Sequence, residues 1–384
     1  MTPEVSRPMP ASPRRPGLRL LAGLAALVLV AGACGSSGTT AAPSAASSLP
    51  PAQSAQPSTD TSGSPMATAS AGPTASDGTS PDPVSVPLTV GLGYIPSVQF
   101  AQFYLADQAG YYTAARLAVT LQNKIDPDLI TLVGQGAVDI GSGDGTSVIP
   151  AVSQGIPVVY VATIYGNFPS VVIAKADSGI AAPADLRGKR IGIPGKYGSS
   201  WIMLQAMLDS AGLTTNDVTV VEFPDYGQAA ALQQGTVDAA TGFTNNEPIQ
   251  LANAGITTNV LTVDAIVPLP GPGLVTGRAT LASKTDALAA FTAATLRAME
   301  EITADPQKGL DATFVAVPEL ASNPTLQRQI LDATIATWKN TRTGEPLGSI
   351  DTAGWQSSLD FMGKLGLVPN PVTVDQLVDG SLLP

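Results

Sequence analysis

The sequence predicts an α/β protein whose globular part forms two similar lobes with a cleft between them. Short valine-rich segments alternate with helical segments through the middle of the chain. This alternation is typical of mainly parallel sheets covered by helices. One pattern of strand, turn and helix also occurs twice. In two such lobes, the loops that follow the carboxyl ends of the strands face the cleft.

The two copies of this pattern share an order of elements, and each helix ends at an Ala-Gly pair. In the first copy the strand is 88–92, the turn is 94–97 and the helix ends at Gly110. In the second copy the strand is 190–193, the turn is 194–199 and the helix ends at Gly212. The segment Gln-Gly-Ala-Val-Asp at 135–139 is likewise matched by Gln-Gly-Thr-Val-Asp at 234–238, at nearly the same offset. Gly-x-Val-Asp is common where a helix leads into a strand, so chance repetition is the alternative.

The remaining elements follow from local patterns. Further short strands are predicted at 119–121, 158–162, 171–174 and 218–222. Helical segments are predicted at 128–132, 227–233, 250–254, 288–302, 326–338 and 355–365. We therefore expect one lobe from 86–178 plus 277–384 and the other from 179–276. The hinge strands should lie near 174–178 and 274–277.

The N-terminus has the features of an export signal. Arg14, Arg15 and Arg19 precede an apolar run at 20–33, which ends in small residues directly before Cys34, the only cysteine. The run is too short to span a membrane, which takes about 20 residues. It resembles a bacterial lipoprotein signal, which predicts a signal peptide at 1–33, lipidation of Cys34 and a lipid anchor on the extracytoplasmic face of the cell membrane. An ordinary cleaved signal or a signal anchor is the alternative.

Residues 34–85 are predicted to be a disordered tether. Beyond Cys34 they are mostly Ser, Ala, Pro, Thr and Gly, with no Lys or Arg. Such a composition buries too little apolar surface to offset the entropy of ordering. A flexible chain of this length reaches roughly 40 Å. It either lets the globular part search for a partner or acts as a plain spacer.

Composition excludes several functions. The chain has 19 Lys and Arg against 30 Asp and Glu and no basic stripe, so we expect no nucleic-acid partner. Without histidine it has no Ser-His-Asp or Cys-His system, and zinc sites built on His are excluded. One cysteine allows no disulfide within the chain. We expect no catalytic residues, cofactor or metal, and an enzyme is the least favoured interpretation.

Three segments indicate a family. They are Gly-Tyr-Ile-Pro-Ser-Val-Gln-Phe at 93–100, Asp-Leu-Arg-Gly-Lys-Arg-Ile-Gly at 185–192 and Thr-Asn-Asn-Glu-Pro at 244–248. They resemble segments of the solute-binding proteins that take up the thiamine pyrimidine precursor, riboflavin and, more distantly, sulfonates. The resemblance covers nearly all of the globular part. The Leu-x-Gly-Lys strand within the second segment occurs in many binding proteins, whereas the other two segments are more specific.

The resemblance implies a two-lobed periplasmic-binding-protein-like (type II) fold that closes on a small-molecule ligand. It also implies delivery to the permease and ATPase of an ABC importer, with the protein acting as a monomer. A sensor that presents the closed form to a receptor is equally compatible with the sequence. The pyrimidine-synthesising enzymes that share this fold rely on a histidine, which this chain lacks.

A flat heterocycle is best held by aromatic faces and a few polar groups. Residues of these kinds follow the predicted strands: Tyr94, Gln99, Asp144, Thr146, Tyr165, Asn167 and Phe168 in the first lobe, and Tyr197, Ser199, Trp201, Asp225, Tyr226, Phe243, Asn246 and Glu247 in the second. Each aromatic is also compatible with packing in the core or on the surface. We expect a riboflavin-like ligand ahead of the thiamine pyrimidine.

The glycine-rich segment Gly-Lys-Tyr-Gly-Ser-Ser at 195–200 allows a different ligand class. Free amides at a helix start attract anions. The segment lacks the spacing of a nucleotide-binding loop, so a turn that shapes the cleft is the favoured interpretation. If an anion binds there, a sulfonate or a phosphorylated vitamin becomes the better ligand.

Overall fold

The computed structural model describes residues 85–124 and 128–384. The predicted signal peptide, the lipidation at Cys34 and nearly all of the predicted tether lie outside these residues. Within the described ranges, no helix combines the length and the apolar character that crossing a membrane requires.

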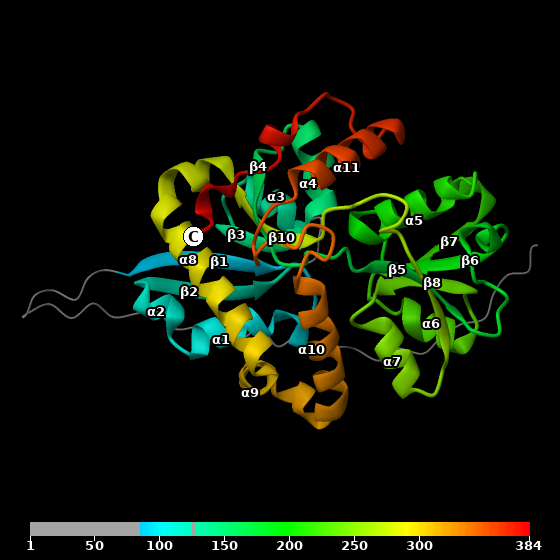
Figure 1. Ribbon diagram of the computed structural model, residues 1–384, viewed down its shortest axis with the longest axis horizontal. Helices are drawn as coiled ribbons and strands as arrows, with labels where there is room; N and C mark the ends of the chain where they lie inside the picture. The colour runs from blue at the N-terminus through cyan, green and yellow to red at the C-terminus, as the bar shows by residue number, and fades with distance from the viewer. Residues whose placement is uncertain (1–84, 125–127) are drawn as a thin grey trace, which may run out of the picture. The chain divides into compact units, whose positions relative to one another are not determined.

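The described residues form two five-stranded sheets (Figure 1). The strands are β1 (Val86–Leu92), β2 (Leu117–Asn123), β3 (Ile140–Asp144), β4 (Val158–Thr163), β5 (Ser170–Lys175), β6 (Arg190–Ile193), β7 (Thr219–Glu222), β8 (Ala239–Phe243), β9 (Thr258–Thr262) and β10 (Pro272–Gly277). The first sheet has the order β2-β1-β3-β10-β4 and the second the order β7-β6-β8-β5-β9.

The two sheets have the same topology, in agreement with the repeated sequence pattern. In the first sheet β1 pairs in parallel with β2 and β3, and β10 pairs antiparallel with β3 and β4. In the second sheet β6 pairs in parallel with β7 and β8, and β5 pairs antiparallel with β8 and β9. The expected mainly parallel sheets are therefore mixed, with one antiparallel strand each.

The chain passes between the sheets twice, at 164–169 and at 263–271. Both passages come before the expected hinge strands, because β5 belongs to the second sheet and β10 to the first. A short valine-rich segment such as β5 does not reveal in its own sequence which sheet it joins. The bounds of the two lobes remain a prediction, for which we propose these passages as the limits.

Helices cover both sheets. They are α1 (Ala101–Gln108), α2 (Tyr111–Ala114), α3 (Asp128–Gly134), α4 (Gly145–Ser153), α5 (Gly198–Ser210), α6 (Gln228–Gln234), α7 (Glu247–Asn253), α8 (Arg278–Ala304), α9 (Pro306–Ala316), α10 (Pro324–Trp338) and α11 (Thr352–Lys364), with a short 3₁₀ helix, η1 (Val98–Phe100), before α1. Every helical segment that the sequence predicts overlaps one of these elements.

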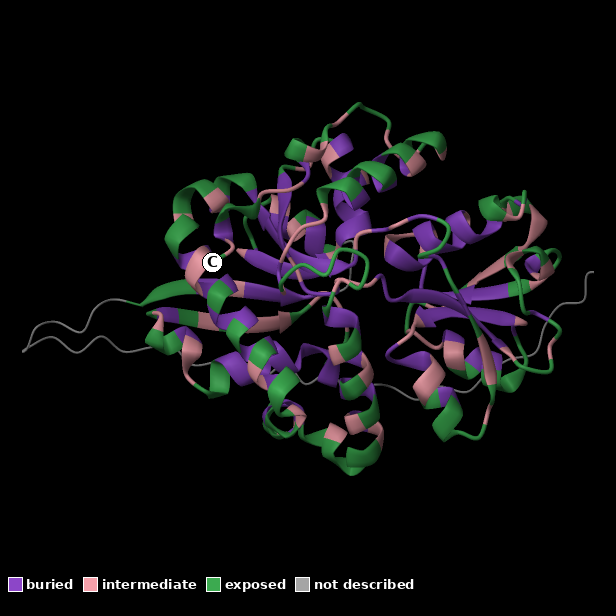
Figure 2. Ribbon diagram, in the orientation of Figure 1, coloured by how far each residue is buried: buried purple, intermediate pink, exposed green. Residues whose placement is uncertain are grey.

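Alternation along the strands separates the cores on the two faces of the first sheet. In β4, Val159 and Val161 pack with the α1 and α8 side, whereas Val158 and Tyr160 pack with the α3, α4 and α11 side. The second of these cores continues into α5 of the second sheet, where α4 packs against α5. The central strands of both sheets are mostly buried, whereas β2, β7 and β9 at the sheet edges are more exposed (Figure 2).

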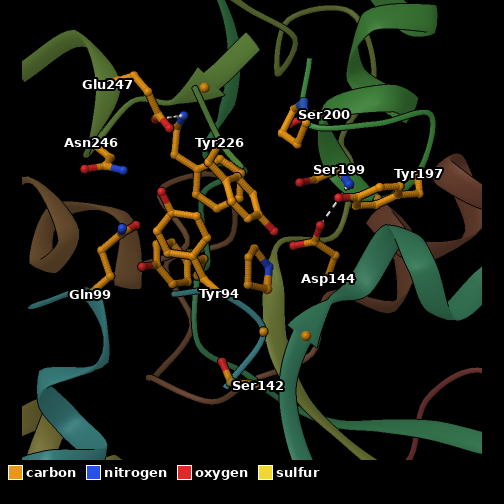
Figure 3. Close-up of a pocket in the computed structure, with 18 of the residues that line it drawn as sticks. Tyr94, Gln99, Ser142, Asp144, Tyr197, Ser199, Ser200, Tyr226, Asn246 and Glu247 are labelled. Atoms are coloured by element: carbon orange, nitrogen blue, oxygen red, sulfur yellow. Dashed lines mark hydrogen bonds between the residues drawn. The ribbon is translucent and has the colours of Figure 1, made fainter. Parts of the chain in front are cut away.

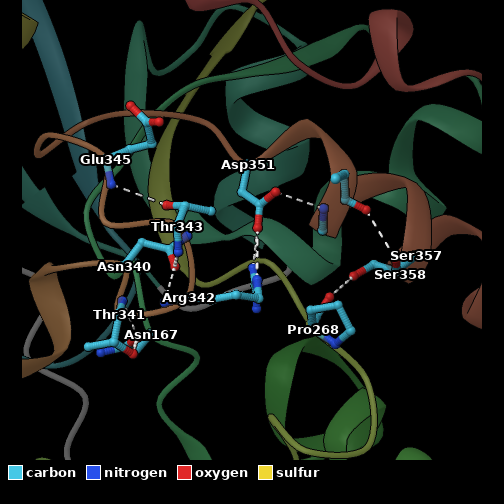
Figure 4. Close-up of polar contacts among 12 residues, drawn as sticks. Asn167, Pro268, Asn340, Thr341, Arg342, Thr343, Glu345, Asp351, Ser357 and Ser358 are labelled. Atoms are coloured by element: carbon cyan, nitrogen blue, oxygen red, sulfur yellow. Dashed lines mark hydrogen bonds and ion pairs between the residues drawn. The ribbon is translucent and has the colours of Figure 1, made fainter.

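Residues in the C-terminal part of the chain form hydrogen bonds to both passages (Figure 4). In the first passage, the Asn167 Oδ1 accepts hydrogen bonds from the backbone N–H and the hydroxyl of Thr341, at 3.0 and 2.8 Å. In the second passage, the carbonyl of Pro268 accepts a hydrogen bond of 2.5 Å from the hydroxyl of Ser358. The stretch from the end of α10 into α11 is therefore bonded to both passages between the sheets.

Candidate ligand-binding site

A pocket lies between the two sheets, at the ends of strands from both. Its empty space, with the open solvent at its mouth included, is about 820 Å³. It is lined by Gly93, Tyr94, Gln99, Phe100, Ser142, Gly143, Asp144, Tyr165, Pro194, Tyr197, Gly198, Ser199, Ser200, Tyr226, Gln228, Gly242, Phe243, Asn246, Glu247 and Pro272. Both copies of the repeated pattern thus contribute their first turn to one pocket.

Aromatic side chains from both sides meet across this pocket. The rings of Tyr94 and Tyr226 lie 4.7 Å apart at 83° (Figure 3), and those of Tyr165 and Phe243 lie 6.5 Å apart at 66°. Such edge-to-face pairs are favourable arrangements of aromatic rings. Tyr226 has a φ of 60°, a conformation that costs energy for a bulky residue. Backbone strain of this kind concentrates at functional sites.

Asp144 connects the two sides at the pocket wall. It is the last residue of β3 in the first sheet, and its Oδ2 accepts a hydrogen bond of 2.8 Å from the Ser199 N–H at the start of α5 (Figure 3). Burial raises the pKa of the Asp144 carboxyl, and the hydrogen bonds from Ser199 oppose that rise. Asp144 therefore joins the first sheet to a helix of the second.

Asn245 makes a second connection, which the sequence analysis missed. It follows β8 and is fully buried. Its Nδ2 donates to the Gln99 Oε1 at 2.9 Å and to the Thr334 Oγ1 at 2.8 Å, both in the half of the chain built on the first sheet. Asn245 belongs to the Asn-Asn-Glu-Pro segment, which was the signal that could have identified it.

Glu247 is hydrogen-bonded within the half of the chain built on the second sheet. It is the first residue of α7, only 7% exposed, and its Oε2 accepts a hydrogen bond of 2.7 Å from the Phe243 N–H. Burial raises the pKa of Glu247 against the effect of this bond. Burial and then the charge of Glu247 raise the pKa of Tyr94. The carboxylate thus stabilises the turn between β8 and α7 as well as lining the pocket.

Of the fifteen residues expected to hold the ligand, ten line the pocket. They are Tyr94, Gln99, Asp144, Tyr165, Tyr197, Ser199, Tyr226, Phe243, Asn246 and Glu247. Phe168 and Asp225 do not line it.

Thr146, Asn167 and Trp201 also lie outside the lining, so the pocket gives their expected role in ligand binding no support. Thr146 is fully buried in the first turn of α4. Asn167 is occupied by its bonds to Thr341, and Trp201 packs against the core around α5.

Gln228 is a lining residue that the sequence did not indicate. It begins α6, is 1% exposed, and its Oε1 has no hydrogen-bond partner among the described residues. Gly192 lies so close that a Cβ there would come within 3.1 Å of the Gln228 Cβ. A lone glutamine near the start of a predicted helix gave no pattern by which to select it.

The pocket has an acidic rather than a basic character. Its lining includes the carboxyl groups of Asp144 and Glu247 and no lysine or arginine. Among residues 85–124 and 128–384, no group of three or more His, Cys, Asp or Glu is placed to hold a metal ion. The arrangement offers aromatic faces and a few polar groups to a small molecule and disfavours an anion.

Two halves of equal topology with a pocket between them are the architecture of a periplasmic binding protein. The chain belongs to the NMT1/THI5-like family, because the family described as "NMT1/THI5 like" matches residues 97–309. The chain is also similar to the riboflavin-binding protein RibY of Chloroflexus aurantiacus. The two are 34% identical over 322 residues, which cover 83% of this chain and 92% of RibY.

Other relatives show the range of the family. A formylaminopyrimidine-binding protein of Halalkalibacterium halodurans is 27% identical over 293 residues, which cover 74% of this chain and 87% of that protein. Enzymes named 4-amino-5-hydroxymethyl-2-methylpyrimidine phosphate synthase also match, and the one from Legionella pneumophila is 25% identical over 47% of this chain. The relatives named as binding proteins thus match a larger share of the chain.

A solved structure confirms the fold. The periplasmic aliphatic sulphonate binding protein SsuA from Escherichia coli superposes with a TM-score of 0.61, covering 76% of this chain and 97% of that chain. The identity is 19%, so this likeness shows the fold and not the ligand. The predicted two-lobed α/β fold of the periplasmic-binding-protein type is therefore confirmed.

Proposed function

We propose that this protein is the extracytoplasmic solute-binding component of an ABC importer and captures a riboflavin-like heterocycle. The observation that carries the proposal is the composition of the pocket wall, with aromatic rings from both sides and no cationic side chain. The similarity to a riboflavin-binding protein over 83% of the chain supports it. The permease and the ATPase would be its partners. The protein would act as a monomer whose two lobes close on the ligand.

A sulfonate ligand and a synthase activity agree less well with the residues present. A sulfonate would face two carboxyl groups and no lysine or arginine among the lining residues. A synthase of the kind found among the relatives would have to work without histidine, which the sequence lacks. A sensor would use the same pocket and differ only in the partner that recognises the closed form.

We expect the purified protein to bind riboflavin more tightly than formylaminopyrimidine and not to bind taurine. The larger ring system of riboflavin can contact aromatic side chains from both sides of the pocket, whereas taurine offers no flat face. Quenching of flavin fluorescence would measure the first affinity, and calorimetric titration the other two. Binding of taurine alone would contradict the heterocycle proposal.

We also propose that Cys34 anchors the protein to the membrane. Cys34→Ala should leave the globular part folded and release the protein into the soluble fraction, because the single thiol is the only site for the predicted lipid. Fractionation of cells that express each form, followed by a melting curve, would test both parts. A variant that remains in the membrane after signal cleavage would show that the anchor lies elsewhere.

A further inference from the structure

Asp144 lies at the start of one helix and is bonded to the start of another. It is the residue directly before α4, a position where an Asp side chain usually accepts a hydrogen bond from an amide of its own helix. Asp144 makes no such bond with α4. Its carboxylate instead accepts from the Ser199 N–H, in the first turn of α5 on the other side of the pocket (Figure 3).

The start of α5 has the properties of an anion site. No side chain of its own segment caps the helix, and its first turn contains no acidic residue. Gly198 has a φ of 61°, and the Tyr197 ring lies so close to Gly195 that a Cβ there would meet it at 2.2 Å. The free amides and the positive end of a helix of 13 residues attract a negative group. The negative group present at this position is the carboxylate of Asp144.

A ligand anion could not use this position while Asp144 occupies it. A phosphate or sulfonate placed beside α5 would meet the Asp144 carboxylate at close range, and like charges repel. The lining offers no lysine or arginine that would compensate. A neutral ring system meets no such repulsion and gains the aromatic contacts of the pocket.

We propose that Asp144 determines the charge specificity of the site. Its carboxylate fills the anion position at the start of α5, so the pocket accepts an uncharged heterocycle and rejects the same heterocycle when it bears a phosphate ester or a sulfonate. The choice of a heterocycle rests on the proposed function above. The occupation of the α5 start by Asp144 is independent of it.

The variant Asp144→Ser tests this role. Serine removes the carboxylate and supplies a side chain that can cap α4. We expect the wild type to bind riboflavin at least about tenfold more tightly than riboflavin 5′-phosphate and not to bind sulfate. In the variant, that ratio should fall by at least about tenfold and sulfate binding should become measurable by calorimetry. The ratio of the two flavin affinities is the readout, because loss of the bond to Ser199 lowers the affinity for every ligand.

Glu247→Gln is the matched control. It removes the other carboxylate of the pocket without freeing a helix start, so the ratio should fall much less than in Asp144→Ser. If Asp144→Ser does not fold, Asp144→Asn keeps the shape of the side chain and should still lose part of the discrimination against the phosphate.

Three results would overturn the proposal: equal binding of both flavins by the wild type, an unchanged ratio in the Asp144 variants, or an equal change in Glu247→Gln. If no form binds riboflavin, the proposed function fails, and the sulfate titration still decides the role of Asp144.

Discussion

Replacing Asn245 with leucine should weaken ligand binding by roughly 5- to 150-fold. Leucine has nearly the shape of asparagine, but it cannot donate to Gln99 or Thr334. The Gln99 Oε1 then loses its buried partner, a loss that costs about 1–3 kcal/mol. Because these bonds join the two sides of the pocket, the cost falls on the closed form. Each 1.4 kcal/mol corresponds to about tenfold in affinity.

Two measurements would separate this effect from a general loss of stability. Titration gives the affinity, and X-ray scattering without ligand should show a larger radius of gyration for Asn245→Leu. The control is Asn253→Ala, which removes a hydrogen bond of 2.7 Å to Gln329 between α7 and α10. Both residues of that pair are exposed, so its loss should change little. Wild-type affinity and scattering in Asn245→Leu would show that the bond does not hold the closed form.

Replacing Glu247 with alanine should lower the free energy of unfolding by about 1–3 kcal/mol in the absence of ligand. The Phe243 N–H loses its acceptor, and an unsatisfied amide in a partly buried turn is costly. The affinity should fall as well, because Glu247 lines the pocket. Urea unfolding measures the first effect and titration the second.

Glu247→Gln distinguishes these two effects. Glutamine retains an oxygen that can accept from Phe243, so most of the lost stability should return. An unfolding free energy for Glu247→Ala equal to that of the wild type would show that the bond to Phe243 does not stabilise the fold.

Much of the fold followed from local sequence. The strand predicted at 190–193 matches β6, and the helix predicted at 326–338 lies within α10. The repeated pattern correctly indicated two sheets of one topology, because each copy has the same order of strands and helices. Tyr94 and Tyr197 were selected for the same reason, since each belongs to the turn after the first strand of its copy.

The remaining features depend on contacts between distant segments. Asn167 looked like a cleft residue, yet its partner Thr341 lies far along the chain and no local pattern links the two. Asn245 and Asn246 are adjacent and of one type, but only the fold shows that Asn245 bonds across to Gln99. The pairing of β5 with β8 and β9 likewise results from tertiary structure, so a periodicity in sequence could not assign it.

The way the chain enters and leaves the second sheet has a consequence for how such proteins diversify. All strands of that sheet lie within the single stretch 170–262, and the chain returns through β10 beside the strand from which it left. Thr163 of β4 lies opposite Gly273 of β10 in the antiparallel ladder. The second sheet is therefore an insertion between two neighbouring strands of the first. Recombination within the passages 164–169 and 263–271 would exchange the whole second sheet, and with it one wall of the pocket. Every strand pair of the first sheet would remain intact.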